Sequence, residues 1–175
     1  MRILVTGGVR SGKSTRAESL LGDGAALYVA AGPTPDAEAD PDWTARVAAH
    51  RARRPSAWTT VETQDLAAVL RDAHTPVLID CLGTWLTAVI DAEAAWEWPT
   101  DRVLDLVLAR VDDVVVALGE CAHDVVLVTN EVGLGVVPAH RSGRLFRDLL
   151  GTVNQRVAAA CDEVHLVVAG RVLKI

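Results

Sequence analysis

The sequence predicts an α/β fold in three layers, a mainly parallel sheet with helices on both faces. Short runs that are apolar throughout alternate along the chain with longer segments of helical pattern. Strands without polar alternation are typical of parallel sheets, because helices cover both faces of such a sheet. The chain has 175 residues and is 50% hydrophobic, which suits one core, so we expect a single domain over residues 1–175.

Each apolar run predicts one strand. The expected strands cover residues 3–5, 27–30, 58–61, 77–79, 125–128, 164–169 and 172–175. The segments between them predict helices over residues 14–21, 41–54, 65–71, 84–91, 101–118 and 143–160. We expect Asp40 and Thr100 to cap two of these helices and Pro55 to end one, because proline disfavours helix in the residue before it. Residues 32–39 and 92–99 are expected to be irregular.

Charge and composition narrow the class of protein. The formal net charge is −6, which argues against a general nucleic-acid-binding protein. No apolar stretch approaches the roughly 18 residues that a membrane-spanning helix needs. The three cysteines, Cys81, Cys121 and Cys161, stand apart with no CxxC pair. This pattern favours a reducing cytoplasm and no structural metal.

A glycine-rich loop follows the first expected strand. Gly7, Gly12, Lys13 and Ser14 match the pattern GxxxxGK(S/T), and a helix is expected directly after them. Glycines let the backbone curl so that its N–H groups point at phosphate oxygens, and the helix N-terminus adds positive potential. Lys13 would reach the β- and γ-phosphates, and Ser14 would bind Mg²⁺. We therefore predict a nucleoside triphosphate site made of Gly7, Gly8, Val9, Arg10, Ser11, Gly12, Lys13 and Ser14.

Four polar side chains follow expected strands, at the edge where parallel sheets bind ligands. Asp80 lies where many P-loop proteins place a carboxylate that holds Mg²⁺, here through water; the alternative is a plain helix cap. Glu62 could accept hydrogen bonds from the N1–H and the amino group of guanine. Asn130 and Glu131 follow the fifth strand. Glu131 has two possible roles. It would act on the substrate, by orienting it or by moving a proton, or it would pair with an arginine and shape the loop.

A basic segment surrounds one histidine. On a helix, Arg46, Arg53 and Arg54 share a face with His50, and Arg51 is its neighbour in the chain. Positive charge nearby disfavours imidazolium, so His50 would tend to stay neutral and nucleophilic. The same arginines would bind a triphosphate and stabilise charge that develops on it. A neutral histidine in such a site can carry a nucleotidyl group, although a solvated basic helix face is the alternative.

Longer motifs resemble one family. The segments ILVTGGVRSGKS, LYVAA, RVAAHRARRP, WTTVE, VLIDCLGTWLT and VVLVTNEVGLGVVP occur in this order along nearly the whole chain. The phosphate loop is common to many families, but the ordered combination of RxxxHxxxRP, WTxxE and TNEVGxGxVP is highly specific. On these motifs the chain resembles the bifunctional adenosylcobinamide kinase / adenosylcobinamide-phosphate guanylyltransferase family, whose members assemble the nucleotide loop of cobalamin.

The resemblance implies a RecA-like P-loop NTPase fold and two activities. The family phosphorylates the aminopropanol hydroxyl of adenosylcobinamide with ATP or GTP, and then transfers GMP from GTP to adenosylcobinamide-phosphate. The family's guanylylated nucleophile falls on His50. Besides the phosphate loop, its nucleotide contacts fall on Ala30, Ala31, Gly32, Arg51, Ala52, Arg53, Arg54, Glu62 and Asp80. Characterised relatives are trimers, so the resemblance also implies a homotrimer.

Some positions depart from the family pattern. Asp80 stands where some relatives have Glu, and residues 32–40 and 92–99 match poorly, so contacts to the corrinoid could differ there. Two other functions stay open, a P-loop kinase with a single activity and a regulatory GTP-binding protein. The latter usually carries an NKxD segment, whereas this chain has Thr129-Asn130-Glu131-Val132. The sequence also leaves open whether one nucleotide site or two serve the reactions.

Overall fold

The computed structural model describes residues 1–33 and 40–175, apart from the side chains of Trp43 and Arg46. Most of the irregular segment expected at residues 32–39 therefore lies outside the described residues. The same holds for the side chain of Arg46, which we expected on the helix face of His50.

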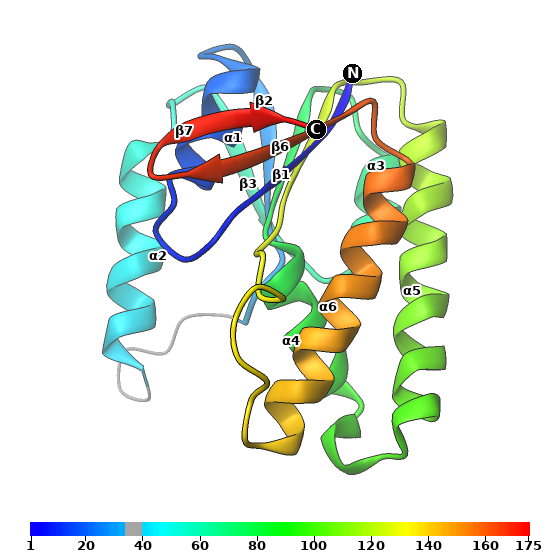
Figure 1. The fold of residues 1–175 in the computed structure, drawn as a ribbon. Helices are drawn as coiled ribbons and strands as arrows, with labels where there is room; N and C mark the ends of the chain where they lie inside the picture. Colours follow the sequence, from blue (N-terminus) through cyan, green and yellow to red (C-terminus); the bar gives the residue numbers. More distant parts are fainter. Residues whose placement is uncertain (34–39) are drawn as a thin grey trace.

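A seven-stranded sheet forms the centre of the fold, in the order β3-β2-β4-β5-β1-β6-β7 (Figure 1). Its strands are β1 (Arg2–Thr6), β2 (Ala26–Ala30), β3 (Trp58–Glu62), β4 (Val77–Asp80), β5 (Val125–Val128), β6 (Glu163–Val168) and β7 (Arg171–Lys174). Neighbouring strands pair in parallel, except that β7 is antiparallel to β6. A turn at residues 169–170 joins these two strands, and so short a connection allows only the antiparallel arrangement. The expected α/β fold with a mainly parallel sheet is confirmed.

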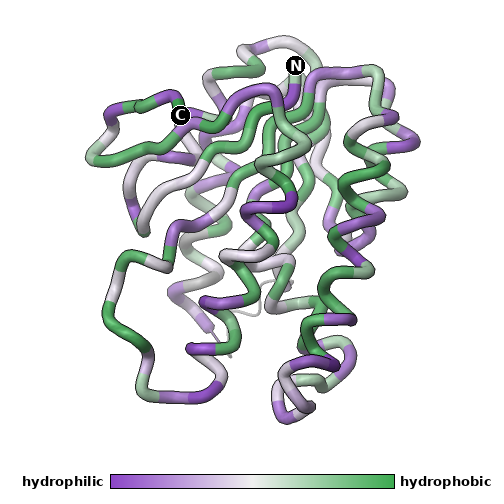
Figure 2. The backbone as a smooth tube through the Cα atoms, turned by 45° about the vertical axis from the view of Figure 1, so that its right-hand side comes forward, coloured by the Kyte–Doolittle hydropathy of each residue, from purple (hydrophilic) through white to green (hydrophobic). Residues whose placement is uncertain are grey.

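Helices cover both faces of this sheet (Figure 1). The helices α1 (Lys13–Leu21) and α2 (Pro41–Arg53) lie on one face. The other face carries α3 (Leu66–Arg71), α4 (Leu82–Ala92), α5 (Thr100–Glu120) and α6 (Arg141–Ala159). One hydrophobic cluster lies beneath α3 to α6 and a smaller one beneath α1. Figure 2 shows strands that are hydrophobic along much of their length and helices that alternate in hydropathy from turn to turn, as buried strands and one-sided helices require.

Some helix ends differ from the expectation. Helix α4 begins at Leu82 rather than at residue 84, because Cys81 and Thr84 form a capping box around its first turn. Thr100 is the first residue of α5 rather than its cap. A short 3₁₀ helix, η1 (Ala95–Glu97), lies within the segment expected to be irregular. Across the described ranges 1–33 and 40–175, no helix is both long enough and apolar enough to cross a membrane.

Candidate nucleotide-binding site

The phosphate loop fills the turn between β1 and α1. A Cβ atom on Gly7 would lie 2.4 Å from the carbonyl oxygen of Val167, so a glycine is required there. Gly12 precedes α1 with a φ angle of +96°, a left-handed conformation that glycine adopts without strain. Arg10 also has a positive φ, of 55°. These positions curl the loop around the N-terminus of α1, which is the arrangement that binds phosphate in P-loop proteins.

Neighbouring segments hold this loop in place. The backbone N–H of Glu131 donates a hydrogen bond to the carbonyl of Gly7 at 3.1 Å. The backbone N–H of Gly170 donates to the carbonyl of Ser11 at 2.8 Å. The loop is therefore fixed from two sides, by the segment after β5 and by the turn between β6 and β7. A fixed loop presents its N–H groups to a phosphate without reorganising.

Lys13 and Ser14 begin helix α1 beside the loop. Lys13 is only 5% exposed, and its Nζ donates a hydrogen bond to the carbonyl of Gly8 at 3.1 Å. The ammonium group therefore lies over the loop, where it can meet phosphate oxygens. Ser14 is half-buried and lines the cavity in front of the loop.

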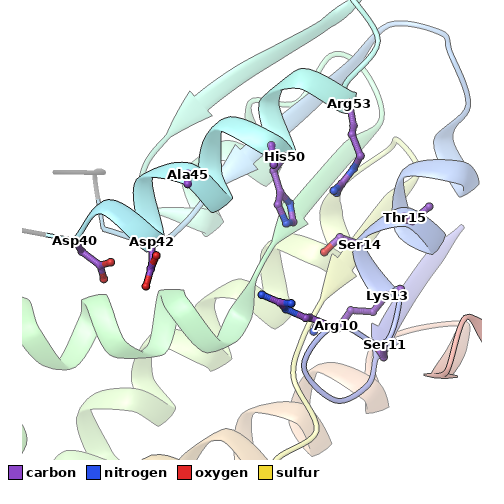
Figure 3. Close-up of a pocket in the computed structure, with 12 residues that line it drawn as sticks. Arg10, Ser11, Lys13, Ser14, Thr15, Asp40, Asp42, Ala45, His50 and Arg53 are labelled. Carbon is purple, nitrogen blue, oxygen red and sulfur yellow. The ribbon is translucent and has the colours of Figure 1, made fainter. Parts of the chain in front are cut away.

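That cavity, of about 930 Å³, opens between the phosphate loop and α2. Figure 3 shows His50 and Arg53 reaching from α2 toward the side where Ser14 lies. The cavity is lined by Arg10, Ser11, Gly12, Lys13, Ser14, Thr15, Asp40, Asp42, Ala45, Ala49, His50 and Arg53. Its volume falls within the range of small-molecule sites, and its basic side chains suit a polyphosphate.

A smaller cavity, of about 120 Å³, also has His50 in its wall. Ala30 pairs in register with both Asp80 and Glu62, so these three residues form one row across the ends of β4, β2 and β3. The lining consists of Tyr28, Ala30, Gly32, Pro33, Val47, His50, Arg54, Glu62, Asp80, Cys81, Thr84 and Asn130. His50 therefore belongs to both cavities, the one at the phosphate loop and the one at the strand ends.

His50 faces the carboxylate of Asp80. Nδ1 of His50 lies 3.7 Å from Oδ2 of Asp80, and the two side chains are 20% and 10% exposed. Oδ2 of Asp80 is buried and has no hydrogen-bond partner among the described residues. A carboxylate on the Nδ1 side of an imidazole favours the tautomer whose Nε2 keeps its lone pair. Asp80 is not the cap of α4, because Cys81 occupies that position.

Arg53, the last residue of α2, and Arg54, which follows it, line different cavities. Arg53 lines the larger cavity and forms an ion pair with Glu18 of α1 at 3.1 Å. Arg54 follows the helix and lines the smaller cavity. Arg51 forms an ion pair with Glu62. A guanine base that used the Glu62 carboxylate would therefore have to share it with Arg51.

Not all of the site residues expected from the sequence line a cavity. Those that line neither cavity are Gly7, Gly8, Val9, Ala31, Arg51, Ala52 and Glu131. The Glu131 carboxylate accepts a hydrogen bond from the backbone N–H of Gly133 at 2.6 Å, which fits the role of shaping the loop. Asn130 lines the smaller cavity, and its carbonyl accepts a hydrogen bond from the side chain of Asn154 at 3.1 Å.

Sequence reasoning missed Tyr28 and Cys81, which also line the smaller cavity. The alternation of side chains along β2 puts Tyr28 on the same face as Ala30, and this was the available signal. Burial raises the pKa of the Tyr28 phenol, the charge of Asp80 raises it further, and Arg54 opposes the shift. Burial, followed by the charge of Asp80, also raises the pKa of the Cys81 thiol. Both groups therefore stay protonated at neutral pH, and the thiol is unreactive.

A strand, a phosphate loop and a helix in front of a basic cavity define a P-loop nucleotide-binding protein. Within this class, the chain belongs to the CobU family, cobinamide kinase / cobinamide phosphate guanyltransferase, whose model matches residues 3–175. Two proteins named bifunctional adenosylcobalamin biosynthesis protein CobU, from Escherichia coli K12 and Salmonella typhimurium LT2, are each 42% identical to it over 100% of this chain and 99% of their own length. The bifunctional adenosylcobalamin biosynthesis protein CobP of Pseudomonas aeruginosa is 38% identical over 97% of this chain and 94% of its own length. The family resemblance seen in the motifs is confirmed.

Proposed function

We propose that this chain phosphorylates adenosylcobinamide with ATP or GTP and transfers GMP from GTP to adenosylcobinamide-phosphate, as one nucleotide-binding domain. Relatives named as bifunctional match the whole chain, which supports both activities. The observation that carries the proposal is the position of His50, in the wall of both cavities.

One GTP molecule would occupy both cavities. The polyphosphate would lie in the larger cavity, against Lys13 and the loop, and the nucleoside in the smaller one, near Ala30, Arg54 and Glu62. The α-phosphorus is the atom that joins a nucleoside to its polyphosphate. It would therefore lie near the wall that the cavities share, beside His50.

Guanylyl transfer would proceed in two displacements. In the first, Nε2 of His50 attacks the α-phosphorus, so that a P–N bond forms and the P–O bond to pyrophosphate breaks. Lys13 and Arg53 would stabilise the charge on the leaving pyrophosphate. In the second, a phosphate oxygen of adenosylcobinamide-phosphate attacks the same phosphorus. The P–N bond then breaks, its electron pair returns to the imidazole, and adenosylcobinamide-GDP is released.

The kinase reaction would use the phosphate loop without His50. The loop and Lys13 would hold the β- and γ-phosphates while the aminopropanol hydroxyl of adenosylcobinamide attacks the γ-phosphorus. A P–O bond to that hydroxyl oxygen forms, its proton passes to water, and the P–O bond to the nucleoside diphosphate breaks.

We infer that Mg²⁺ accompanies the nucleotide, where it would neutralise phosphate charge. Mg²⁺ prefers hard oxygen ligands, and the Ser14 hydroxyl lines the larger cavity at the start of α1. Within residues 1–33 and 40–175, no group of three or more His, Cys, Asp or Glu side chains could hold a metal ion. Phosphate oxygens would therefore supply most ligands. Asp80 lines the smaller cavity and faces His50, which fits a contact through water rather than direct ligation.

GTP labelled at the α-phosphorus tests the transfer. The wild-type chain should form a covalent adduct that acid destroys and alkali does not, and GTP labelled at the γ-phosphorus should leave no label. His50→Ala should abolish the adduct. His74→Ala is the matched control, because His74 is exposed and lines neither cavity. Wild-type labelling of His50→Ala would refute the assignment of the nucleophile.

Adenosylcobinamide and GTP together test for both activities. We expect adenosylcobinamide-phosphate to appear first and adenosylcobinamide-GDP to follow. A reaction that stops at adenosylcobinamide-phosphate would identify a kinase with a single activity. The homotrimer and the cytoplasmic location stay predictions, and sedimentation equilibrium tests the former.

A further inference from the structure

Tyr28 lies beneath the proposed nucleoside cavity. It is 3% exposed and pairs in register with Thr60 of β3 and Leu78 of β4. The next row along the same face contains Ala30, Asp80 and Glu62. Tyr28 is therefore a diagonal neighbour of both carboxylates, within reach of its long side chain.

The ring of Tyr28 supports Arg54. The Arg54 guanidinium carbon lies 3.3 Å from the ring centroid, a cation–π contact. Nη1 of Arg54 donates a hydrogen bond to Oγ1 of Thr60 at 2.9 Å. The buried Nε of Arg54 has no partner among the described residues. The guanidinium therefore lies over the Tyr28 ring. Its Nε–H can still donate a hydrogen bond in the wall of the smaller cavity.

Tyr28 and Asp80 line the same cavity, and burial, followed by the charge of Asp80, raises the pKa of the Tyr28 phenol. Because this phenol stays protonated, it can donate to the carboxylate but cannot compete with it for a proton. Oδ2 of Asp80 is buried, has no partner among the described residues and lies 3.7 Å from Nδ1 of His50. Tyr28 thus lies beside the carboxylate that faces the nucleophile, and its ring contacts the arginine that lines the cavity.

We propose that Tyr28 is a positioning residue for the guanylylation of His50. Its hydroxyl holds Asp80 so that Oδ2 faces Nδ1 of His50, and its ring holds Arg54 toward the nucleoside. The inference rests on the proposed function. When the Nε2–P bond forms and the P–O bond to pyrophosphate breaks, the imidazole gains a positive charge. Nearby arginines oppose that charge, and a correctly placed Asp80 offsets it while keeping the proton on Nδ1.

Two substitutions separate the two contacts. Tyr28→Phe removes the hydroxyl, with its interactions with Asp80 and Arg54, but keeps the ring on which the Arg54 guanidinium lies. It should slow adduct formation in a single turnover about tenfold, the scale of losing a partner that orients a functional histidine, with GTP affinity unchanged. Tyr28→Leu removes the ring as well, so it should show the same slowing together with weaker GTP binding. Leu78→Met, a swap of similar volume in the same row, is the control for packing and should leave both quantities unchanged.

A double-mutant cycle with Asp80→Asn tests whether Tyr28 acts through Asp80. If it does, adding Tyr28→Phe to Asp80→Asn slows adduct formation no further. A further tenfold slowing, or a wild-type rate for Tyr28→Phe alone, would overturn the inference. Absence of any adduct in the wild-type chain would instead overturn the proposed function.

Discussion

Replacing Gly7 with alanine adds a methyl group where there is no room for it. The new Cβ would lie 2.4 Å from the carbonyl oxygen of Val167 and 2.6 Å from Oγ of Ser11. A carbon and an oxygen in close contact stay about 3.3 Å apart, so the loop and β6 would have to separate by roughly 0.9 Å, the difference between about 3.3 Å and 2.4 Å. Val167 belongs to the sheet, where it pairs with Val172 of β7. The loop is therefore the part that moves.

The structure sets the expected magnitude of this change. Overpacking of this kind costs about 2 kcal/mol, which lowers the melting temperature of a chain of this length by about 4–8 °C. A loop displaced by nearly an ångström also loses alignment with the phosphates. Losing two charge-assisted hydrogen bonds of about 1.5 kcal/mol each raises the dissociation constant of GTP about 100-fold.

Thermal melting and titration calorimetry with GTP measure the two effects. Gly8→Ala is the matched control, because its new Cβ would have no atom within 4 Å and its φ is not in the left-handed region. We expect Gly8→Ala to melt as the wild-type chain does. Equal losses of stability in the two variants, or wild-type GTP affinity in Gly7→Ala, would show that the contact with Val167 does not set the loop position.

Other predictions concern the charges of the site and of the sheet edge. Lys13→Ala removes the ammonium over the loop and should raise the dissociation constants of GTP and ATP about 10–100-fold; calorimetry that finds unchanged affinity for both nucleotides would contradict the phosphate-loop assignment. Lys174 first, and His165 second, lower the pKa of Glu163 below its ordinary value of 4.5. A carboxylate whose pKa is lowered by folding stabilises the fold above its unfolded pKa, and this contribution is lost as the pH falls through the folded pKa. The wild-type chain should therefore melt above Glu163→Gln at neutral pH, with a difference that shrinks below about pH 4.5. Melting curves recorded across this pH range test the direction of the change. A difference in melting temperature that stays constant with pH would contradict it.

The sequence was sufficient for the features that depend on local pattern. Runs such as residues 125–128 predict buried strands because every side chain in them is apolar, and the structure places them in the sheet. The phosphate loop was equally local, because its glycines, Lys13 and Ser14 lie within eight residues of one another. The spacing of Arg53 and Arg54 relative to His50 likewise indicated that these side chains would lie near the imidazole.

Features that depend on strand register could not be read from the sequence. Tyr28 meets Asp80 only because β2 and β4 pair in a particular register, and no local pattern fixes that register. The ion pair between Arg51 and Glu62 likewise joins a helix to a strand through tertiary packing. For the same reason, the division of the site into two cavities appeared only in the structure.

That division bears on the choice between one nucleotide site and two. If one nucleotide occupies both cavities, the two reactions need different parts of it. The kinase reaction needs only the γ-phosphate at the loop, and the loop contacts phosphates rather than the base, so ATP and GTP should both serve. Guanylyl transfer needs the α-phosphorus beside His50, and its position is fixed only when the smaller cavity holds the nucleoside. A site that reads guanine by hydrogen bonds discriminates strongly against other bases, because the wrong base leaves buried polar groups unpaired. One site therefore accounts for a kinase that accepts either nucleotide and a transferase that requires GTP, whereas two separate sites would not require His50 to line both cavities.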